Sequence, residues 1–267
     1  ACRNVMITSG RTSTGASSLF HSVGGDGNTA NGYQSLFENT SGYSNTAVGI
    51  NALNKNTNRS NLVAVGDSAL FNNGTGASIA AEAANNTAVG SKSLFTNTKG
   101  NDNSAIGFQA MKANSTGLNN TAVGSKAMLV STTGSSNVAV GTFSLFSNTT
   151  GSNNVAAGNA ALLSNTTGIS NVAIGKAALL NSANGRNIVS IGDSSLTNYD
   201  NNVTSLTSLY GNNTAVGSKT MFTATTGTSN TAVGSQAMYA NTIGNFNVAV
   251  GNVSLHDNTT GGGNTAI

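Results

Sequence analysis

Fourteen glycines recur along this chain at a nearly constant interval, and that interval limits what the chain can fold into. Successive glycines are 17 residues apart, except for one step of 24 after Gly66 and one of 25 after Gly192. A step so short and regular leaves no room for a conventional globular core, so the chain must grow along one axis by stacking similar coils. These anchor glycines are Gly15, Gly32, Gly49, Gly66, Gly90, Gly107, Gly124, Gly141, Gly158, Gly175, Gly192, Gly217, Gly234 and Gly251.

The residues before each anchor predict a short strand. With the anchor as position 0, the pattern is Asn at −4, Thr or Val at −3, Ala at −2 and Val or Ile at −1, as in Asn45 to Val48. β-Branched residues suit a pleated sheet, and glycine then permits a sharp change of direction. Positions −3 and −1 share one face of the strand, and position −2 faces the other. We expect positions −3 and −1 to point inward and the alanines to lie outside.

Position +4 predicts the core, because it is Leu or Met after all fourteen anchors. Position +5 mixes Phe with Lys112, Asn54 and His256, so we expect that column to be only partly buried. The core column includes Leu36, Leu53, Leu94, Met111, Met128, Leu145, Leu162 and Leu179.

Asparagine marks two further registers. Position −4 is Asn in twelve of fifteen coils, with Arg11, Leu62 and Ile188 as the exceptions. Stacked amides can bond to the coils above and below, which predicts a structural ladder. The segment Asn-Thr-Thr-Gly, as at 148–151, predicts a turn in which Asn caps its own backbone.

Composition excludes several classes of function. The chain has 33 Gly, no Pro and only 7% charged residues, which would suggest disorder if the strict periodicity did not require a stack. The net charge of +3 and the scattered basic residues argue against a nucleic-acid partner. No apolar run reaches the length of a membrane span. Cys2 is the only cysteine, so no internal disulfide can form.

The sequence offers little for catalysis. His21 and His256 stand at opposite ends of the array, and no pair of carboxylates recurs at a useful spacing. Residues 24–28 resemble one copy of a calcium-binding nonapeptide, but acidic residues do not recur in the later coils. We therefore expect no enzyme activity, no cofactor and no bound metal.

These patterns predict an all-β fold, a parallel β-solenoid of about 14 coils with a 17-residue period. Residues 1–14 would form an N-terminal segment or partial coil, and 15–267 a continuous array with insertions near 72–85 and 197–212. One coil buries few apolar side chains, so lateral association through the alanine and position +5 columns is expected. The chain's main partner would then be itself, as a parallel homotrimer.

The two insertions are the first candidates for ligand contacts, because insertions in repeats become loops on one face. Tyr199, Asp200 and Tyr210 could contact a glycan or a protein receptor, with the tyrosines stacking on a sugar ring. Lys92 and Lys126 share position +2 two coils apart and could meet an anionic polysaccharide. The alternative interpretations are a loop that covers the core or an interface, and solvated lysines that keep the stack soluble.

The motif Asn-Thr-Ala-Val-Gly-x-x-Ala-Leu resembles the head repeats of trimeric autotransporter adhesins and the repeats of phage tail fibres, over residues 15 to 267. The adhesin resemblance implies a left-handed parallel β-roll with three chains side by side, displayed outside the cell. The period here is longer than that of the adhesin head repeat, which leaves the cross-section of the coil open.

The leading hypothesis is therefore a structural and adhesive fibre segment on a bacterial cell surface or a virion, which acts as a stiff spacer and can contact a receptor or glycan. An ice-binding β-solenoid is an alternative, since Thr recurs at position −3. It ranks lower because the column mixes Thr with Val, as at Val138 and Val155, and because we expect it to point inward. A self-assembling extracellular filament is the other alternative, because uncapped solenoid ends are adhesive edges.

Overall fold

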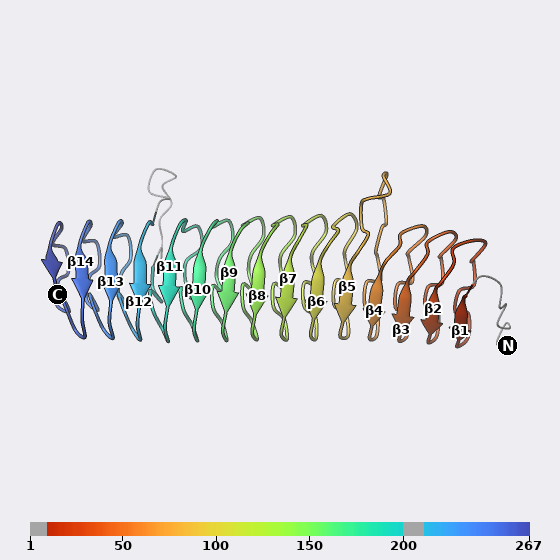
Figure 1. The fold of residues 1–267 in the computed structure, drawn as a ribbon, viewed down its shortest axis with the longest axis horizontal. Helices are drawn as coiled ribbons and strands as arrows, with labels where there is room; N and C mark the ends of the chain where they lie inside the picture. The colour runs from red at the N-terminus through yellow and green to blue at the C-terminus, as the bar shows by residue number, and fades with distance from the viewer. Residues whose placement is uncertain (1–9, 200–210) are drawn as a thin grey trace. The chain divides into compact units, whose positions relative to one another are not determined.

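A computed structural model describes residues 10–199 and 211–267 of the chain. The described chain is an all-β parallel β-solenoid of about 14 turns, with no helix in those residues. Each coil contributes one strand, and the rest of the coil consists of turns (Figure 1). The predicted fold class is confirmed at this level.

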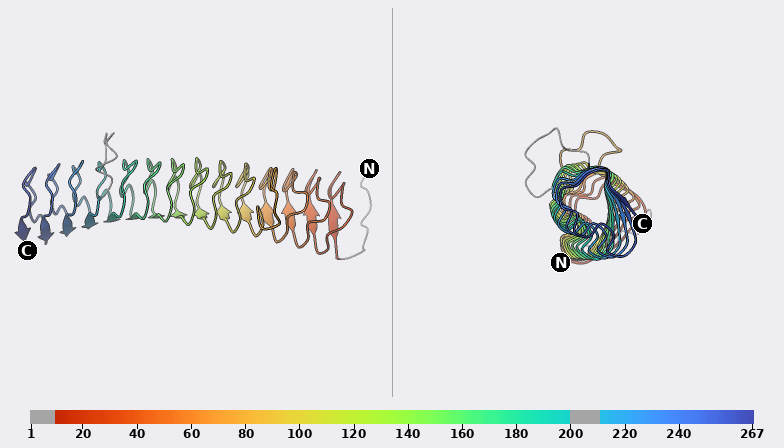
Figure 2. Two further views of the ribbon diagram at one scale, coloured as in Figure 1. Left: turned by 90° about the horizontal axis from the view of Figure 1, so that it is seen from above. Right: turned by 90° about the vertical axis from the view of Figure 1, so that its left-hand side faces the viewer.

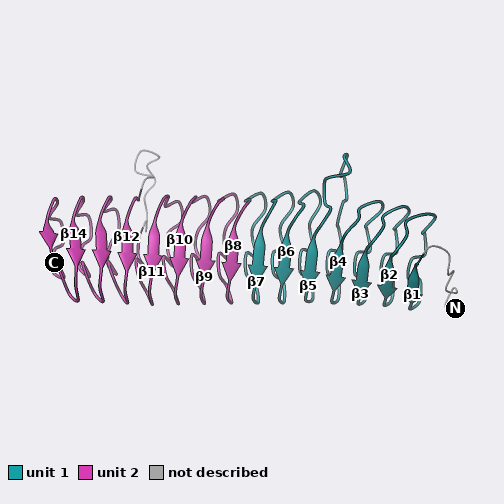
Figure 3. Cartoon of the chain, viewed as in Figure 1, with its two compact units in different colours: residues 1–135 teal, residues 136–267 magenta. Residues whose placement is uncertain are grey.

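The coils fall into two compact units, residues 1–135 and 136–267 (Figure 3). Unit 1 contains β1 (Thr12–Thr14), β2 (Thr29–Asn31), β3 (Thr46–Val48), β4 (Val63–Val65), β5 (Thr87–Val89), β6 (Ser104–Ile106) and β7 (Thr121–Val123). Unit 2 contains β8 (Val138–Val140), β9 (Val155–Ala157), β10 (Val172–Ile174), β11 (Val189–Ile191), β12 (Thr214–Val216), β13 (Thr231–Val233), β14 (Val248–Val250) and β15 (Thr265–Ala266).

Within each unit, every strand pairs in parallel with the next strand along the chain. The register joins equivalent positions, so Ala30 lies opposite Ala47. The longer steps keep this register, since Val63 pairs with Thr87 and Val189 pairs with Thr214. Neither longer step therefore shifts the pairing of the sheet, and the extra residues of the first step lie outside the strands as a loop.

The interior of each coil is narrow and contains the alanines, which corrects one expectation from the sequence. Ala47 and Ala105 at position −2 are fully buried, like Leu53 and Met111 at position +4. The coils close around this small core (Figure 2). Positions −3 and −1 therefore point outward, and lateral association cannot bury the alanines. The eight core-column residues Leu36, Leu53, Leu94, Met111, Met128, Leu145, Leu162 and Leu179 have no exposed surface.

The asparagines at position −4 form a buried ladder that ties successive coils together. Asn28 accepts a hydrogen bond on Oδ1 from the backbone N–H of Asn45 at 2.9 Å. Its Nδ2 donates to the carbonyl of Gly42 at 2.7 Å. The same pair of bonds recurs in unit 2, where Asn154 accepts from the N–H of Asn171 and donates to the carbonyl of Gly168. Each amide thus satisfies one buried donor and one buried acceptor of the following coil.

A second amide ladder runs along position +7. Asn56 donates through Nδ2 to Oδ1 of Asn39 at 3.1 Å. Asn39 donates to Gly42 in its own turn at 3.0 Å, which confirms that the turn asparagine caps its own backbone. The carbonyl of Gly42 therefore accepts from both ladders. Amide side chains hold both the turn and the stack together.

The turn after each anchor places non-glycine residues in the left-handed region. Leu94 has φ 47° and Met111 has φ 51°, conformations that cost about 1 kcal/mol or more for residues with a Cβ. The backbone N–H of Leu94 donates to the carbonyl of Ala110 in the next coil at 3.0 Å, so stacking holds the turn in place. The anchor itself must be glycine: Gly107 has φ 135°, and a Cβ there would lie 2.6 Å from the carbonyl carbon of Gly124.

Position +7 has the same defect at Ser131 in unit 1 and at Ser182 in unit 2, and the first predicts a stabilising substitution. Ser131 stands where Asn is usual, and among the described residues neither its hydroxyl nor Oδ1 of Asn114 has a hydrogen-bond partner. Asn114 itself donates to Asn97 at 3.0 Å, which shows the geometry that an amide adopts here. We expect Ser131→Asn to raise the free energy of unfolding by about 1 kcal/mol by satisfying a buried acceptor. Urea denaturation would measure this gain.

Ser125→Asn is the matched control, because position +1 lies outside both ladders and carries Asn at 159 and 252. Equal denaturation midpoints for the Ser131→Asn and Ser125→Asn variants would contradict the assignment of the defect.

Candidate functional site

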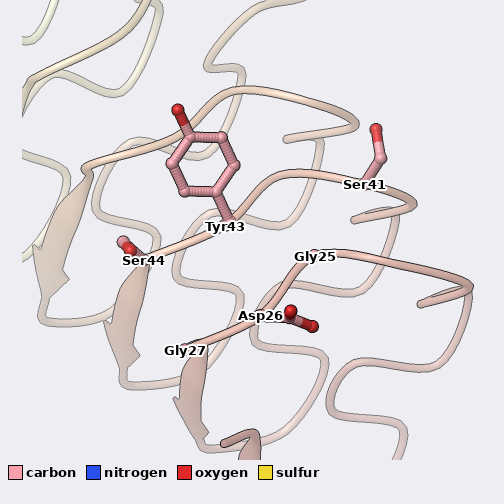
Figure 4. Close-up of a pocket in the computed structure, with 6 residues that line it drawn as sticks. All are labelled: Gly25, Asp26, Gly27, Ser41, Tyr43 and Ser44. Carbon is pink, nitrogen blue, oxygen red and sulfur yellow. The ribbon is translucent and has the colours of Figure 1, made fainter. Parts of the chain in front are cut away.

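Two successive coils of unit 1 leave a shallow hollow of about 460 Å³ at the corner before strands β2 and β3. Figure 4 shows Asp26 rising from one coil and Tyr43 from the next. The hollow is lined by Gly25, Asp26, Gly27, Ser41, Tyr43 and Ser44.

The backbone of the hollow is fixed by glycine and by the amide ladder. Gly25 has φ 83°, and a Cβ there would collide with the carbonyl of Gly42. Asn28 donates to the carbonyls of both Gly25 (3.0 Å) and Gly42 (2.7 Å). The N–H of Ser44 donates to the carbonyl of Asp26 at 2.9 Å. The floor of the hollow is therefore rigid before any ligand arrives.

The side chains at this hollow are unused by the fold. In the described chain, the carboxylate of Asp26 and the hydroxyl of Tyr43 make no hydrogen bond or ion pair with protein groups, and 52% of Tyr43 is exposed. An aromatic face, a carboxylate and the hydroxyls of Ser41 and Ser44 are the groups that bind a sugar ring and its hydroxyls. No sequence periodicity points to this hollow, because Asp26 and Tyr43 stand at a position that varies from coil to coil.

The prediction that Tyr199 contacts a ligand is wrong. Only 3% of this side chain is exposed, so its ring cannot stack on a sugar. Tyr199 stands seven residues after Gly192, at the register of the second asparagine ladder, and its side chain fills the space inside the coil. A Cβ at Gly211 would lie 3.2 Å from its hydroxyl oxygen. Asp200 and Tyr210 lie outside the described residues.

Lys92 and Lys126 stand at position +2 of two coils in unit 1, as the register predicts, with Gln109 between them in the chain's repeat. All three residues have φ near 56° and are half-buried. Lysines elsewhere in the unit form ion pairs, Lys55 with Glu38 at 2.6 Å and Lys99 with Glu82 at 3.7 Å. Such half-exposed pairs contribute little to stability.

The first insertion is a structured loop of unit 1 rather than a break in the stack. Asn73 accepts from Asn97 at 2.8 Å, so the position +7 ladder continues across the longer step. Asn73 also donates to the carbonyl of Ala83, where the extra segment returns to the coil. Within the loop, Glu82 accepts from the N–H groups of Ser78 at 2.6 Å and Ile79 at 3.3 Å.

Half-buried rings stack along position +5 in both units. The rings of Phe71 and Phe95 lie 5.3 Å apart across the first insertion. In unit 2, Tyr239 stacks between Phe222 and His256 at 5.4 and 5.2 Å. The column is partly buried, as its mixed composition predicts.

The residues that the structure describes contain no candidate metal site and no candidate membrane-spanning helix. Nowhere in residues 10–199 and 211–267 do three or more His, Cys, Asp or Glu side chains gather at one point. The same residues contain no helix with the length and hydrophobicity of a membrane span.

No protein-family model matches this chain, and no curated protein is significantly similar to it in sequence. Function must therefore be argued from the hollow and from the surfaces of the coils.

Glu82 generates a pH prediction for the insertion. Hydrogen bonds from the N–H groups of Ser78 and Ile79, with a smaller effect of Lys99, hold the pKa of Glu82 below its ordinary value of 4.5. A lowered folded-state pKa means that the carboxylate stabilises the loop above pH 4.5 and that this contribution disappears as the pH falls through the lowered value. We expect the amide NMR signals of Ser78 and Ile79 to titrate below pH 4.5.

Glu82→Gln provides the control, because it should abolish that titration while leaving the amide signals of Asn103 in the core unchanged. A midpoint at or above 4.5 for the Ser78 amide would contradict the proposed contacts.

Proposed function

We propose that this chain is a structural and adhesive segment of an extracellular fibre, in which the coils form a stiff spacer and the hollow at Asp26 and Tyr43 contacts a saccharide. The observation that carries the proposal is the set of free polar and aromatic side chains on a backbone held rigid by Gly25 and Asn28. The role requires no catalysis.

Stiffness follows from the way in which each coil depends on its neighbour. Within a unit, the amide of Asn103 serves the coil after it, and strand pairing and turn hydrogen bonds join the same two coils. Bending the stack would break several of these bonds at once in a dry interior, where each unpaired group costs about 1–3 kcal/mol. Such a stack is suited to holding a contact site away from a surface.

A saccharide fits the hollow better than a protein partner does. Its volume of about 460 Å³ is within the range of small-molecule sites, and its openness to solvent suits a hydrated ligand. A stable protein interface needs about 800 Å² from each partner, far more than six lining residues provide. Tyr43 would stack on the apolar face of a sugar, and Asp26 would accept from its hydroxyls.

The proposal includes display on a bacterial surface or a virion, with three left-handed chains of 17-residue coils side by side. The sequence predicts association through two columns, the alanines at position −2 and the residues at position +5. Only position +5 is available for contacts between chains, because the alanines are internal. Contacts between chains would then involve stacked rings such as Phe71 and Phe95.

Removal of the Tyr43 ring should abolish most of the saccharide binding. We expect Tyr43→Ala to weaken the affinity about tenfold, equivalent to about 1.4 kcal/mol of lost stacking and burial. A glycan array would identify the ligand, and isothermal titration calorimetry would measure the change. Tyr33→Ala is the matched control, because Tyr33 is 50% exposed but lies outside the hollow. Equal losses for both variants, or no glycan bound by the unmodified chain, would contradict the proposal.

The oligomeric state gives a second test. Sedimentation equilibrium should give three times the chain mass of 26.5 kDa. Phe71→Ser with Phe95→Ser should dissociate the trimer, since these substitutions remove its apolar contact. Phe108→Ser, at a ring that is 49% exposed but stands at position +1, should leave it intact. A monomer at micromolar concentration would contradict the association.

A further inference from the structure

The outer face of strands β2 to β7 is a second surface of unit 1, distinct from the hollow. It presents two columns, positions −3 and −1, and the register between successive strands runs without a bulge. These side chains are half-buried or exposed on every one of the six strands. Position −3 carries Thr29, Thr46, Val63, Thr87, Ser104 and Thr121, and position −1 carries Asn31, Val48, Val65, Val89, Ile106 and Val123.

The hydroxyl groups of this face are not used by the protein. Across the described residues, Thr46, Thr87 and Thr121 make no side-chain hydrogen bond to a protein group, whereas threonines at the turn register do. Thr40 donates through Oγ1 to the carbonyl of Thr57 at 3.0 Å, and Thr98 donates to that of Ser115 at 3.0 Å. The turn hydroxyls therefore belong to the fold, and the sheet hydroxyls are left to solvent or a ligand.

The face is also free of charge. None of its twelve side chains is ionisable, and the lysines and carboxylates of unit 1 stand at other positions, as Lys55 and Glu38 do. A charged partner would find no complementary group here. The occupant that matches this surface is electrically neutral.

The spacing of the side chains on this face is fixed in two directions. Neighbouring strands lie about 4.8 Å apart, and positions −3 and −1 are about 6.7 Å apart along each strand. β-Branched side chains have few accessible χ1 rotamers, which limits the positions that the methyl groups of Thr and Val can take. The result is a lattice of methyl groups in which five of the six residues at position −3, all but Val63, add a hydroxyl.

We infer that this face of unit 1 binds ice. Water held in cages over the methyl groups and anchored by the hydroxyls of Thr46, Thr87 and Thr121 would be ordered at the two spacings of the sheet, which are similar to repeats of the ice lattice. The outward direction of position −3 removes one of the two objections that the sequence raises, and within strands β2 to β7 Val63 is the one residue of that column without a hydroxyl. The inference is independent of saccharide binding at the hollow.

A protein partner fits the same face less well. Six strands of three residues present about 300 Å², well below the roughly 800 Å² that each side of a stable protein interface provides. An ice surface has no such requirement, because it is periodic and is met by every strand at once. The hydroxyls of Thr87 and Thr121 would also lose water at a dry protein interface without gaining a partner.

The experiment measures thermal hysteresis and ice recrystallisation with the whole chain and three variants. Thr87→Lys and Thr121→Lys place a long charged side chain on the face and should lose most of both activities. Thr116→Lys is the matched control, because Thr116 is an exposed threonine of unit 1 at a turn register, and it should keep both activities. Circular dichroism melting curves would establish that all three variants are folded.

Ice shaping by the unmodified chain, lost in the two face variants and kept in the control, supports the inference. No hysteresis from the folded chain, or equal activity in all variants, overturns it. Sedimentation of the same samples tests whether a second copy of the chain binds this face instead. If it does, the unmodified chain shows no ice activity and the two lysine substitutions dissociate the oligomer, which overturns the inference. Tyr43→Ala should leave hysteresis unchanged, which separates this site from the saccharide hollow.

Discussion

The amide of asparagine is the interaction on which the rest of this structure depends. A short coil leaves many backbone groups with no partner inside its own turn, and buried groups of this kind need partners from elsewhere in the chain. Asn28 pairs with the N–H of Asn45 and the carbonyl of Gly42, and Asn39 pairs with the same carbonyl. Because both ladders meet there, Gly42 has no room for a side chain: a Cβ would contact Oδ1 of Asn39. The asparagine amides therefore require glycine at the turn position whose carbonyl they bind.

That constraint explains how a composition typical of disordered chains can form the regular coils of the described residues. Few apolar groups are buried per coil, so hydrogen bonds in a dry core must compensate for the left-handed turns at residues such as Leu94. The same constraint explains positions where a ladder asparagine is replaced. Ile188 replaces a ladder asparagine in unit 2, and the neighbouring Tyr199 fills the space where an amide would stand. Apolar packing and amide pairing are alternative ways to fill the same column.

The sequence predicts what repeats and misses what depends on direction. Position +4, as at Leu94, is recognisable because a shared core requires the same side chain in every coil. Alternation shows that Val48 and Thr46 share a face of the strand, but it does not say which face is inward. The signal for the inward face is that position −2 always has a small side chain, as a narrow interior requires, and Ala47 at that position is fully buried. The sequence places Tyr199 in a loop because the longer step after Gly192 hides its register. The hollow at Asp26 breaks the repeat, so no periodic signal marks it.

Strict stacking also determines what kinds of site such a fold can carry. Any outward residue type that the repeat retains recurs about every 4.8 Å, which builds a lattice, as the column Thr46, Val63, Thr87, Ser104 and Thr121 does on the sheet of unit 1. A site for a discrete ligand needs the opposite, a local departure from the repeat, and Asp26 beside Tyr43 provides one. The repeat tolerates this departure because the side chains concerned lie outside both ladders while Asn28 still satisfies the backbone beneath them. Extended and local recognition can therefore coexist in one unit without disturbing the core that supports them.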